Sequence, residues 1–195
     1  MVHASAGQAS FRLLAALAVP AARLPCLVSV GIQDAGQTCS PPSRIIVESG
    51  IYEKLTEMMA ERYRALKVGP AMDDLDVGPL ISARQKEIVE GFVNAADPAR
   101  IVAQATIVDS APAGGHYFAP TLYGGIEADD PLAQDEIFGP VQVIIPFDTE
   151  EDALRIANGT AYGLVASIWT LNGARHMRMA KACRSGQIFI YTYGQ

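Results

Sequence analysis

The last third of the chain alternates between short β-branched runs and amphipathic helical stretches, and this alternation most constrains the fold. Helices are predicted at 149–158 and 173–183, the first opened by a threonine cap and closed by Asn-Gly. Strands are predicted at 141–147, 164–169 and 187–191. Strands joined through helices by short connections pair in parallel. Ligands of open parallel sheets bind at the carboxyl ends of strands, where we expect a site.

The middle of the chain continues the same pattern. Arg44–Val47 is a predicted strand, and apolar residues then recur at helical spacing from Ile51 to Leu66. Ser82 and Gln85 form a predicted capping box ahead of a second helix. Extended segments are expected near 101–102 and 116–123. The fold class is therefore α/β, with a largely parallel sheet and flanking helices.

Size and charge restrict the function. The chain has 195 residues, half of them apolar, which is enough for one domain with a hydrophobic core. Its 15 basic and 21 acidic residues give a net charge of -6. Because such a surface repels polyanions, we expect no nucleic-acid partner.

The cysteines point to a reducing compartment. There are three, an odd number, without a C-x-x-C pair, so neither a disulfide framework nor a metal site is predicted. A cytoplasmic location follows from this. The cysteines and the scattered histidines are Cys26, Cys39, Cys183, His3, His116 and His176.

Residues 1–29 differ from the rest of the chain. They are alanine-rich and nearly uncharged, and the apolar run 13–22 after Arg12 is similar to a signal peptide. The run is too short to cross a bilayer, so no membrane partner is expected. We divide the chain into an atypical leader, 1–29, and a domain, 30–195. Export is the alternative, and the mass of the mature N-terminus distinguishes the two.

Cys39 is the first candidate for chemistry. It lies between small residues, just before the predicted strand at Arg44, where its sulfur is approachable. A thiolate at such a place acts as a nucleophile. An isolated cysteine is, however, more often an inert apolar residue.

Glu136 and Phe138 are the second candidates. They place a carboxylate and an aromatic ring two positions apart at the entrance to the strand 141–147. Such a pair can accept hydrogen bonds from a ribose and cover a flat ring. The alternative is a solvated carboxylate beside a core phenylalanine.

Taken together and in this order, the two segments resemble the aldehyde dehydrogenase superfamily. Gly36–Ser40 (GQTCS) matches the core of its N-x-G-Q-x-C motif, and Glu136–Pro140 (EIFGP) matches its E-x-F-G-P block. Further similar blocks follow collinearly at 43–47, 77–81, 119–122 and 157–164. The resemblance covers residues 30–195 and implies the catalytic domain of the aldehyde dehydrogenase fold.

The resemblance implies oxidation of a small-molecule aldehyde to a carboxylic acid with NAD or NADP. Cys39 would attack the carbonyl to give a thiohemiacetal, which passes hydride to the nicotinamide and leaves a thioester for hydrolysis. Its own backbone amide would form half of an oxyanion hole. Glu136 would hold the nicotinamide ribose, and Phe138 would contact the nicotinamide ring.

Other parts of the family pattern are missing. The family carries a general-base glutamate a few dozen positions before the cysteine, but the first glutamate here is Glu48. Asp34 and Tyr191 stand where the family usually has asparagine. We expect a chain truncated at both ends and nearly inactive alone, because losing even one oxyanion donor costs about 100-fold to 1000-fold.

Two alternatives remain at this point. A residual thiol esterase needs only the nucleophile and the oxyanion amide, without NAD. A non-catalytic remnant would instead persist as a homo-oligomer or by pairing with a full-length homologue through its sheet edge.

Overall fold

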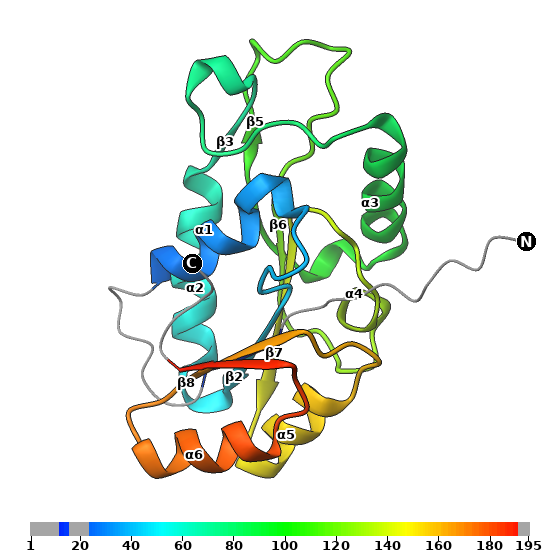
Figure 1. The fold of residues 1–195 in the computed structure, drawn as a ribbon. Helices are drawn as coiled ribbons and strands as arrows, with labels where there is room; N and C mark the ends of the chain where they lie inside the picture. The colour runs from blue at the N-terminus through cyan, green and yellow to red at the C-terminus, as the bar shows by residue number, and fades with distance from the viewer. Residues whose placement is uncertain (1–11, 16–23, 191–195) are drawn as a thin grey trace, which may run out of the picture.

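A twisted, mostly parallel sheet forms the centre of the molecule (Figure 1). The computed structural model describes residues 12–15 and 24–190, and within them this sheet has seven strands. The strands are β1 Arg12–Ala15, β2 Arg44–Glu48, β4 Ile101–Gln104, β6 Thr121–Tyr123, β7 Val141–Phe147, β8 Val165–Trp169 and β9 Gln187–Ile190. Their order is β4-β6-β7-β2-β1-β8-β9, and every neighbouring pair is parallel except β4 and β6. The predicted α/β class and largely parallel sheet are confirmed.

Helices lie on both faces of this sheet. They are α1 Leu24–Ile32, α2 Ser49–Ala65, α3 Ala83–Ala95, α4 Pro131–Gln134, α5 Glu150–Asn158 and α6 Gly173–Ala182, with short 3-10 turns η2 Gln33–Gly36, η3 Ala71–Asp73 and η4 Pro98–Arg100. Both α2 and α5 contact β2 and β7. Because these strands are buried along nearly their whole length, the two helices cover opposite faces. A small parallel pair, β3 Lys67–Val68 and β5 Thr106–Ile107, lies at the top of Figure 1.

The predicted helix starts are confirmed by their caps. Thr149 Oγ1 accepts a hydrogen bond from the Asp152 amide at 3.1 Å, and Ser82 Oγ accepts one from the Gln85 amide at 3.2 Å. The Gln85 side chain does not complete a capping box. Its amide instead reaches the segment before β7, which becomes important at the candidate site.

The strands β7, β8 and β9 are parallel as predicted, but they are not consecutive in space. The strands β2 and β1 lie between β7 and β8. β1 pairs with β2 in the register Arg12 to Arg44 and with β8 in the register Arg12 to Ala166. The sequence analysis predicted neither this strand nor α1, since the strand and most of the helix fall within the expected leader, 1–29. The rest of the apolar run 13–22, and Tyr191, lie outside the described residues.

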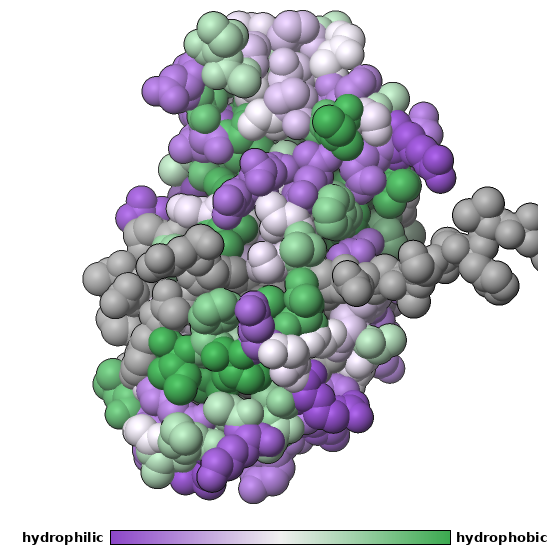
Figure 2. Space-filling model, in the orientation of Figure 1, coloured by the Kyte–Doolittle hydropathy of each residue, from purple (hydrophilic) through white to green (hydrophobic). Residues whose placement is uncertain are grey.

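The core is built on the two faces of these central strands. Its largest fully buried side chains are Trp169, Arg44, Tyr63, Tyr123, Leu27, Ile45, Ile46 and Met59. Among the described residues, none of the helices has the length and apolar character needed to cross a bilayer. Apolar side chains also gather on the surface over β9 (Figure 2), where Ile190 is 40% exposed. Among the described strands, β9 pairs only with β8 and so forms one edge of this sheet.

Candidate functional site

Cys39 lies in an irregular loop between η2 and β2, and its side chain is exposed. The last three residues of η2, just before this loop, have left-handed backbone: Asp34 at φ 50°, Ala35 at φ 53° and Gly36 at φ 72°. Such a conformation costs free energy for every residue except glycine. The chain therefore makes a tight turn just before Cys39, closed by a hydrogen bond from the Gln37 amide to the Asp34 carbonyl at 3.1 Å, and this turn costs free energy.

This turn brings the cysteine loop against the segment before β7. A Cβ on Gly36 would overlap the carbonyl group of Gly139 and lie 2.6 Å from the nitrogen of Pro140. Only glycine fits at this contact, because it must have both a positive φ and no side chain. The two motifs, about 100 residues apart in the chain, thus touch backbone to backbone.

A small pocket lies at this contact. Its lining includes Thr38 next to the cysteine, and both Glu136 and Phe138. Cys39 itself is not one of the lining residues. The fold therefore brings the two predicted motifs together at one pocket, and Cys39 directly follows the lining residue Thr38 in the chain.

These residues lie at the amino ends of the strands, contrary to the expected carboxyl ends. The Cys39 loop leads into β2, and Glu136–Pro140 leads into β7, its parallel neighbour. At the other end, the same strands pass directly into helices, since α2 starts at Ser49 and α5 at Glu150. Only the amino ends thus have loops long enough to hold the candidate residues.

Glu136 is partly buried at the pocket, and this burial raises the pKa of its carboxyl group. Over residues 12–15 and 24–190, no side chain or backbone amide donates a hydrogen bond to its carboxylate. A carboxylate that is partly desolvated yet unpaired can accept hydrogen bonds from a ligand. Glu136 and Phe138 both line this pocket, and the ribose contact predicted for Glu136 stays a prediction.

Phe138 is held in a conformation that presents its ring. Its φ is 54°, and its side chain is 38% exposed. The Gln85 amide on α3 fixes this segment by donating to the carbonyls of Ile137, at 3.1 Å, and Phe138, at 2.9 Å. Sequence reasoning had read Gln85 only as a capping residue, because nothing local reveals a partner 52 positions away.

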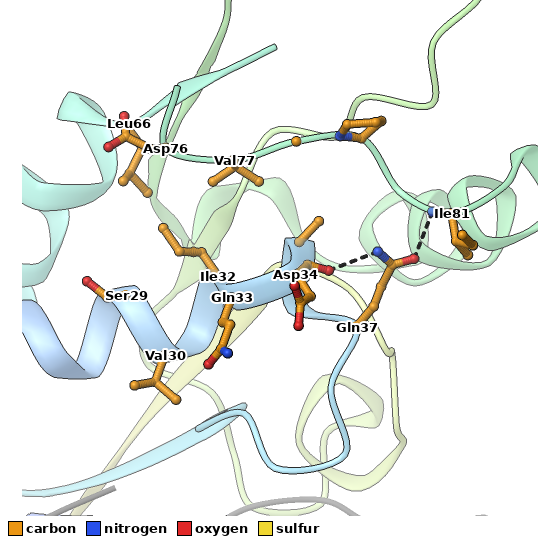
Figure 3. Close-up of a pocket in the computed structure, with 13 residues that line it drawn as sticks. Ser29, Val30, Ile32, Gln33, Asp34, Gln37, Leu66, Asp76, Val77 and Ile81 are labelled. Atoms are coloured by element: carbon orange, nitrogen blue, oxygen red, sulfur yellow. Dashed lines mark hydrogen bonds between the residues drawn. The ribbon is translucent and has the colours of Figure 1, made fainter. Parts of the chain in front are cut away.

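Gln37 fixes the cysteine loop from the other side. Its Nε2 donates to the carbonyl of Asp34 and its Oε1 accepts from the amide of Ile81, both at 2.9 Å (Figure 3). The glutamine of the G-Q-x-C pattern therefore holds the turn closed and ties it to the segment 77–81. That segment was quoted among the similar blocks, but the bond between them was not predicted.

A larger pocket opens beside this bond (Figure 3). The end of α1 and the segment 76–81 form its walls, and it carries two carboxylates, Asp34 and Asp76. The Asp76 Oδ2 accepts from the amide of Lys67 at 2.8 Å. The lining residues are Ser29, Val30, Ile32, Gln33, Asp34, Ala35, Gln37, Leu66, Asp76, Val77, Gly78, Pro79 and Ile81.

Comparison with known proteins gives one consistent result. A sequence model of the aldehyde dehydrogenase family matches residues 13–195. The crystal structure of a putative aldehyde dehydrogenase from Burkholderia cenocepacia is 44% identical, with a TM-score of 0.91 over 96% of this chain and 40% of that one. The match with the family therefore includes residues 13–29 as well as the domain 30–195 over which the sequence motifs resemble the family.

Two further solved structures are similar. HpcC from Thermus thermophilus is 34% identical, with a TM-score of 0.84 over 97% of this chain and 38% of its own. An aldehyde dehydrogenase C variant from Pseudomonas syringae, solved with NAD+ and octanal, is 27% identical, with a TM-score of 0.87 over 97% of this chain and 40% of its own. The chain thus spans about 40% of the length of these relatives.

Proposed function

Because the chain belongs to the aldehyde dehydrogenase family, we propose that it carries the nucleophile and the nicotinamide contacts of an aldehyde oxidation. Cys39 is the nucleophile, Glu136 and Phe138 hold NAD or NADP, and the substrate is a small-molecule aldehyde. Residues 30–195 then belong to the catalytic domain of the family, and the compartment is the cytoplasm. These residues carry only part of the reaction, so the isolated chain turns over slowly or not at all.

The contact between Gly36 and Gly139 is the observation that supports this proposal most strongly. It joins the loop of the nucleophile to the segment of the nucleotide contacts without any intervening side chain. Because catalysis depends on reacting groups being held in a fixed geometry, direct backbone contact is the arrangement such a reaction needs.

The first step uses groups of this chain alone. The Cys39 thiolate attacks the aldehyde carbon, a carbon–sulfur bond forms, and the carbonyl oxygen takes up the negative charge. The backbone amide of Cys39 donates to that oxygen. Bound NAD or NADP would supply the acceptor for the hydride, and water would then release the acid from the Cys39 thioester.

The residues at the pocket fit a nicotinamide nucleotide. The unpaired Glu136 carboxylate can accept from the two ribose hydroxyls, and its partial burial, which raises its pKa, favours pairing with such donors. The exposed Phe138 ring offers an apolar surface to a planar ring. Together they orient the nucleotide toward the Cys39 loop.

Selective labelling of the thiols tests the proposal. The chain is treated with a mild electrophile near neutral pH, and peptide mass spectrometry gives the rates at Cys26, Cys39 and Cys183. We expect fast labelling at Cys39 that denaturant abolishes, and protection of Cys39 when NAD is added. Equal rates at all three, with and without denaturant, contradict an organised site.

A residual thiol esterase is a second candidate, favoured by the exposure of Cys39. It predicts continuous hydrolysis of an activated ester that Cys39→Ala abolishes and NAD does not require. The dehydrogenase proposal instead predicts that the ester acylates Cys39 once, with an acyl group that stays on the peptide. The two proposals therefore differ in the amount of alcohol or phenol released from the ester. A thiol esterase releases more than one equivalent per chain, whereas the dehydrogenase proposal allows only one.

A non-catalytic remnant is the third candidate, favoured by the edge strand β9. Within the described residues β9 pairs only with β8, and Ile190 is 40% exposed. Such an edge accepts a further strand from another chain. Co-purification with a full-length homologue that is lost in Ile190→Lys, without selective labelling at Cys39, supports this candidate over the other two.

A further inference from the structure

A buried glutamine is hydrogen-bonded to the end of the cysteine loop, just before β2. Gln142, in the otherwise apolar strand β7, is 0% exposed. Its Nε2 donates to the carbonyl of Pro42 at 2.6 Å and to that of Leu27 at 3.3 Å, and its Oε1 accepts from the Tyr63 hydroxyl at 2.5 Å. One side chain therefore joins β7, α1, α2 and the segment that follows Cys39.

The orientation of this amide is determined by its neighbours. The carbonyls of Pro42 and Leu27 can only accept, so the NH2 group of Gln142 must face them. The oxygen of the amide then faces the Tyr63 hydroxyl, which donates to it because burial raises the pKa of Tyr63 and keeps the hydroxyl protonated. All polar atoms of the glutamine are paired, which offsets the cost of burying it.

The surrounding chain makes room for this side chain. A Cβ on Gly31, in α1, would overlap the Gln142 amide. The glycine, the glutamine and the tyrosine therefore form one arrangement, in which a larger residue at position 31 would displace the amide. A buried polar network of this kind specifies one geometry more strictly than apolar contacts, because its bonds depend on direction.

We propose that Gln142, held in place by its hydrogen bond from Tyr63, is a positioning residue for the Cys39 nucleophile. Gly36 fixes the loop on the side before Cys39, and the bond to Pro42 fixes it three residues after. The thiol thus lies between two fixed points of the loop. One is the contact of Gly36 with Gly139, just before β7, and the other is the bond of Pro42 with Gln142, on β7. This inference rests on the proposed role of Cys39 and adds the residues that set its geometry.

The test compares two reactions of the same thiol in the full chain. Acylation of Cys39 by an activated ester depends on the alignment of thiol and backbone amide, whereas alkylation by iodoacetamide depends mainly on access. For Gln142→Met and Tyr63→Phe we expect the rate of acylation to fall about 10-fold to 100-fold, which is the effect of misplacing a reacting group by about 1 Å. Alkylation should change less than about threefold, since the thiol stays exposed.

Conservative and matched variants separate positioning from folding. Gln142→Glu can donate to Pro42 only while protonated, so its acylation rate relative to the unaltered chain should recover as the pH falls. Gln104→Met removes another strand glutamine, which donates to Thr121 Oγ1 at 3.0 Å on β6, and should leave both rates unchanged. Tyr63→Phe removes only one oxygen atom, so the same comparison of rates can be made with this variant if Gln142→Met does not fold.

The outcomes distinguish this inference from the function beneath it. If folded Gln142→Met or Tyr63→Phe keeps the ratio of acylation to alkylation, the positioning role is wrong while Cys39 remains the nucleophile. If the unaltered chain is not acylated at Cys39 at all, the proposed function fails and the positioning role falls with it.

Discussion

Gly36 shows how much a single position can decide at this site. Its φ of 72° belongs to the left-handed region, and its missing side chain is what lets the Cys39 loop meet Gly139. Two constraints therefore act at Gly36: its backbone must be left-handed, and its α-carbon must carry no side chain. Asp34 and Ala35 share the left-handed backbone, so the turn already holds strain before any substitution.

Gly36→Ala should lower both the stability and the reactivity of the site. A left-handed alanine costs about 1–2 kcal/mol, and the overlap with Gly139 adds to it. Urea unfolding should show this loss, and selective labelling of Cys39 should disappear. Gly91→Ala is the control, because Gly91 lies inside α3 with nothing within 4 Å and should gain about 0.5–1 kcal/mol. Equal unfolding free energies for Gly36→Ala and Gly91→Ala would contradict a tight contact between Gly36 and Gly139.

At the scale of elements, local patterns predicted β2, β7, β8 and the caps of α3 and α5, because periodicity and capping act over a few residues. The resemblance to the family proposed Cys39, Glu136 and Phe138, because each lies inside a contiguous motif. Sequence reasoning could not find the bond between Tyr63 and Gln142, which are 79 positions apart. Nor could it place β1 between β2 and β8, because strand order depends on tertiary packing.

The cap of α5 gives a prediction at this scale. Thr149→Ala removes the oxygen that accepts from the Asp152 amide and should cost about 1 kcal/mol of unfolding free energy. Thr149→Ser keeps the oxygen and should lose only a small part of that. Urea denaturation followed by circular dichroism measures both. A serine variant as unstable as the alanine variant would show that the methyl group, and not the cap, stabilises the helix.

In the molecule as a whole, the pair α5 and α6 is joined by charge. Glu150 bonds Arg178 at 2.8 Å and Arg175 at 3.3 Å. The hydrogen bond from Arg178 is the largest cause that lowers the pKa of Glu150. A carboxyl group with a lowered pKa in the fold stabilises it above the ordinary pKa, and this contribution disappears as the pH falls through the lowered value.

Glu150→Gln should therefore destabilise the chain at neutral pH and progressively less in acid. Urea unfolding at a series of pH values from about 7 down to about 3 measures the difference, since the window spans the carboxyl pKa. Asp152→Asn is the matched control in the same helical turn, because its partner Arg155 is 68% exposed and the pair contributes little. If the loss of unfolding free energy in Glu150→Gln were the same at every pH, the ionised pair of Glu150 with Arg178 and Arg175 would not be its cause.

The pairing of β2 with β7 carries a consequence for the whole site. Arg44 lies opposite Val143, so the loop before one strand and the segment before the other are aligned by the hydrogen-bond ladder between them. A slip of one residue would move one loop along the other by about 3.3 Å and turn every side chain of the strand to the opposite face. The register of β2 and β7 therefore sets the spacing between the Cys39 loop and the segment 136–140 in steps of whole residues, and this spacing is fixed when the two strands pair.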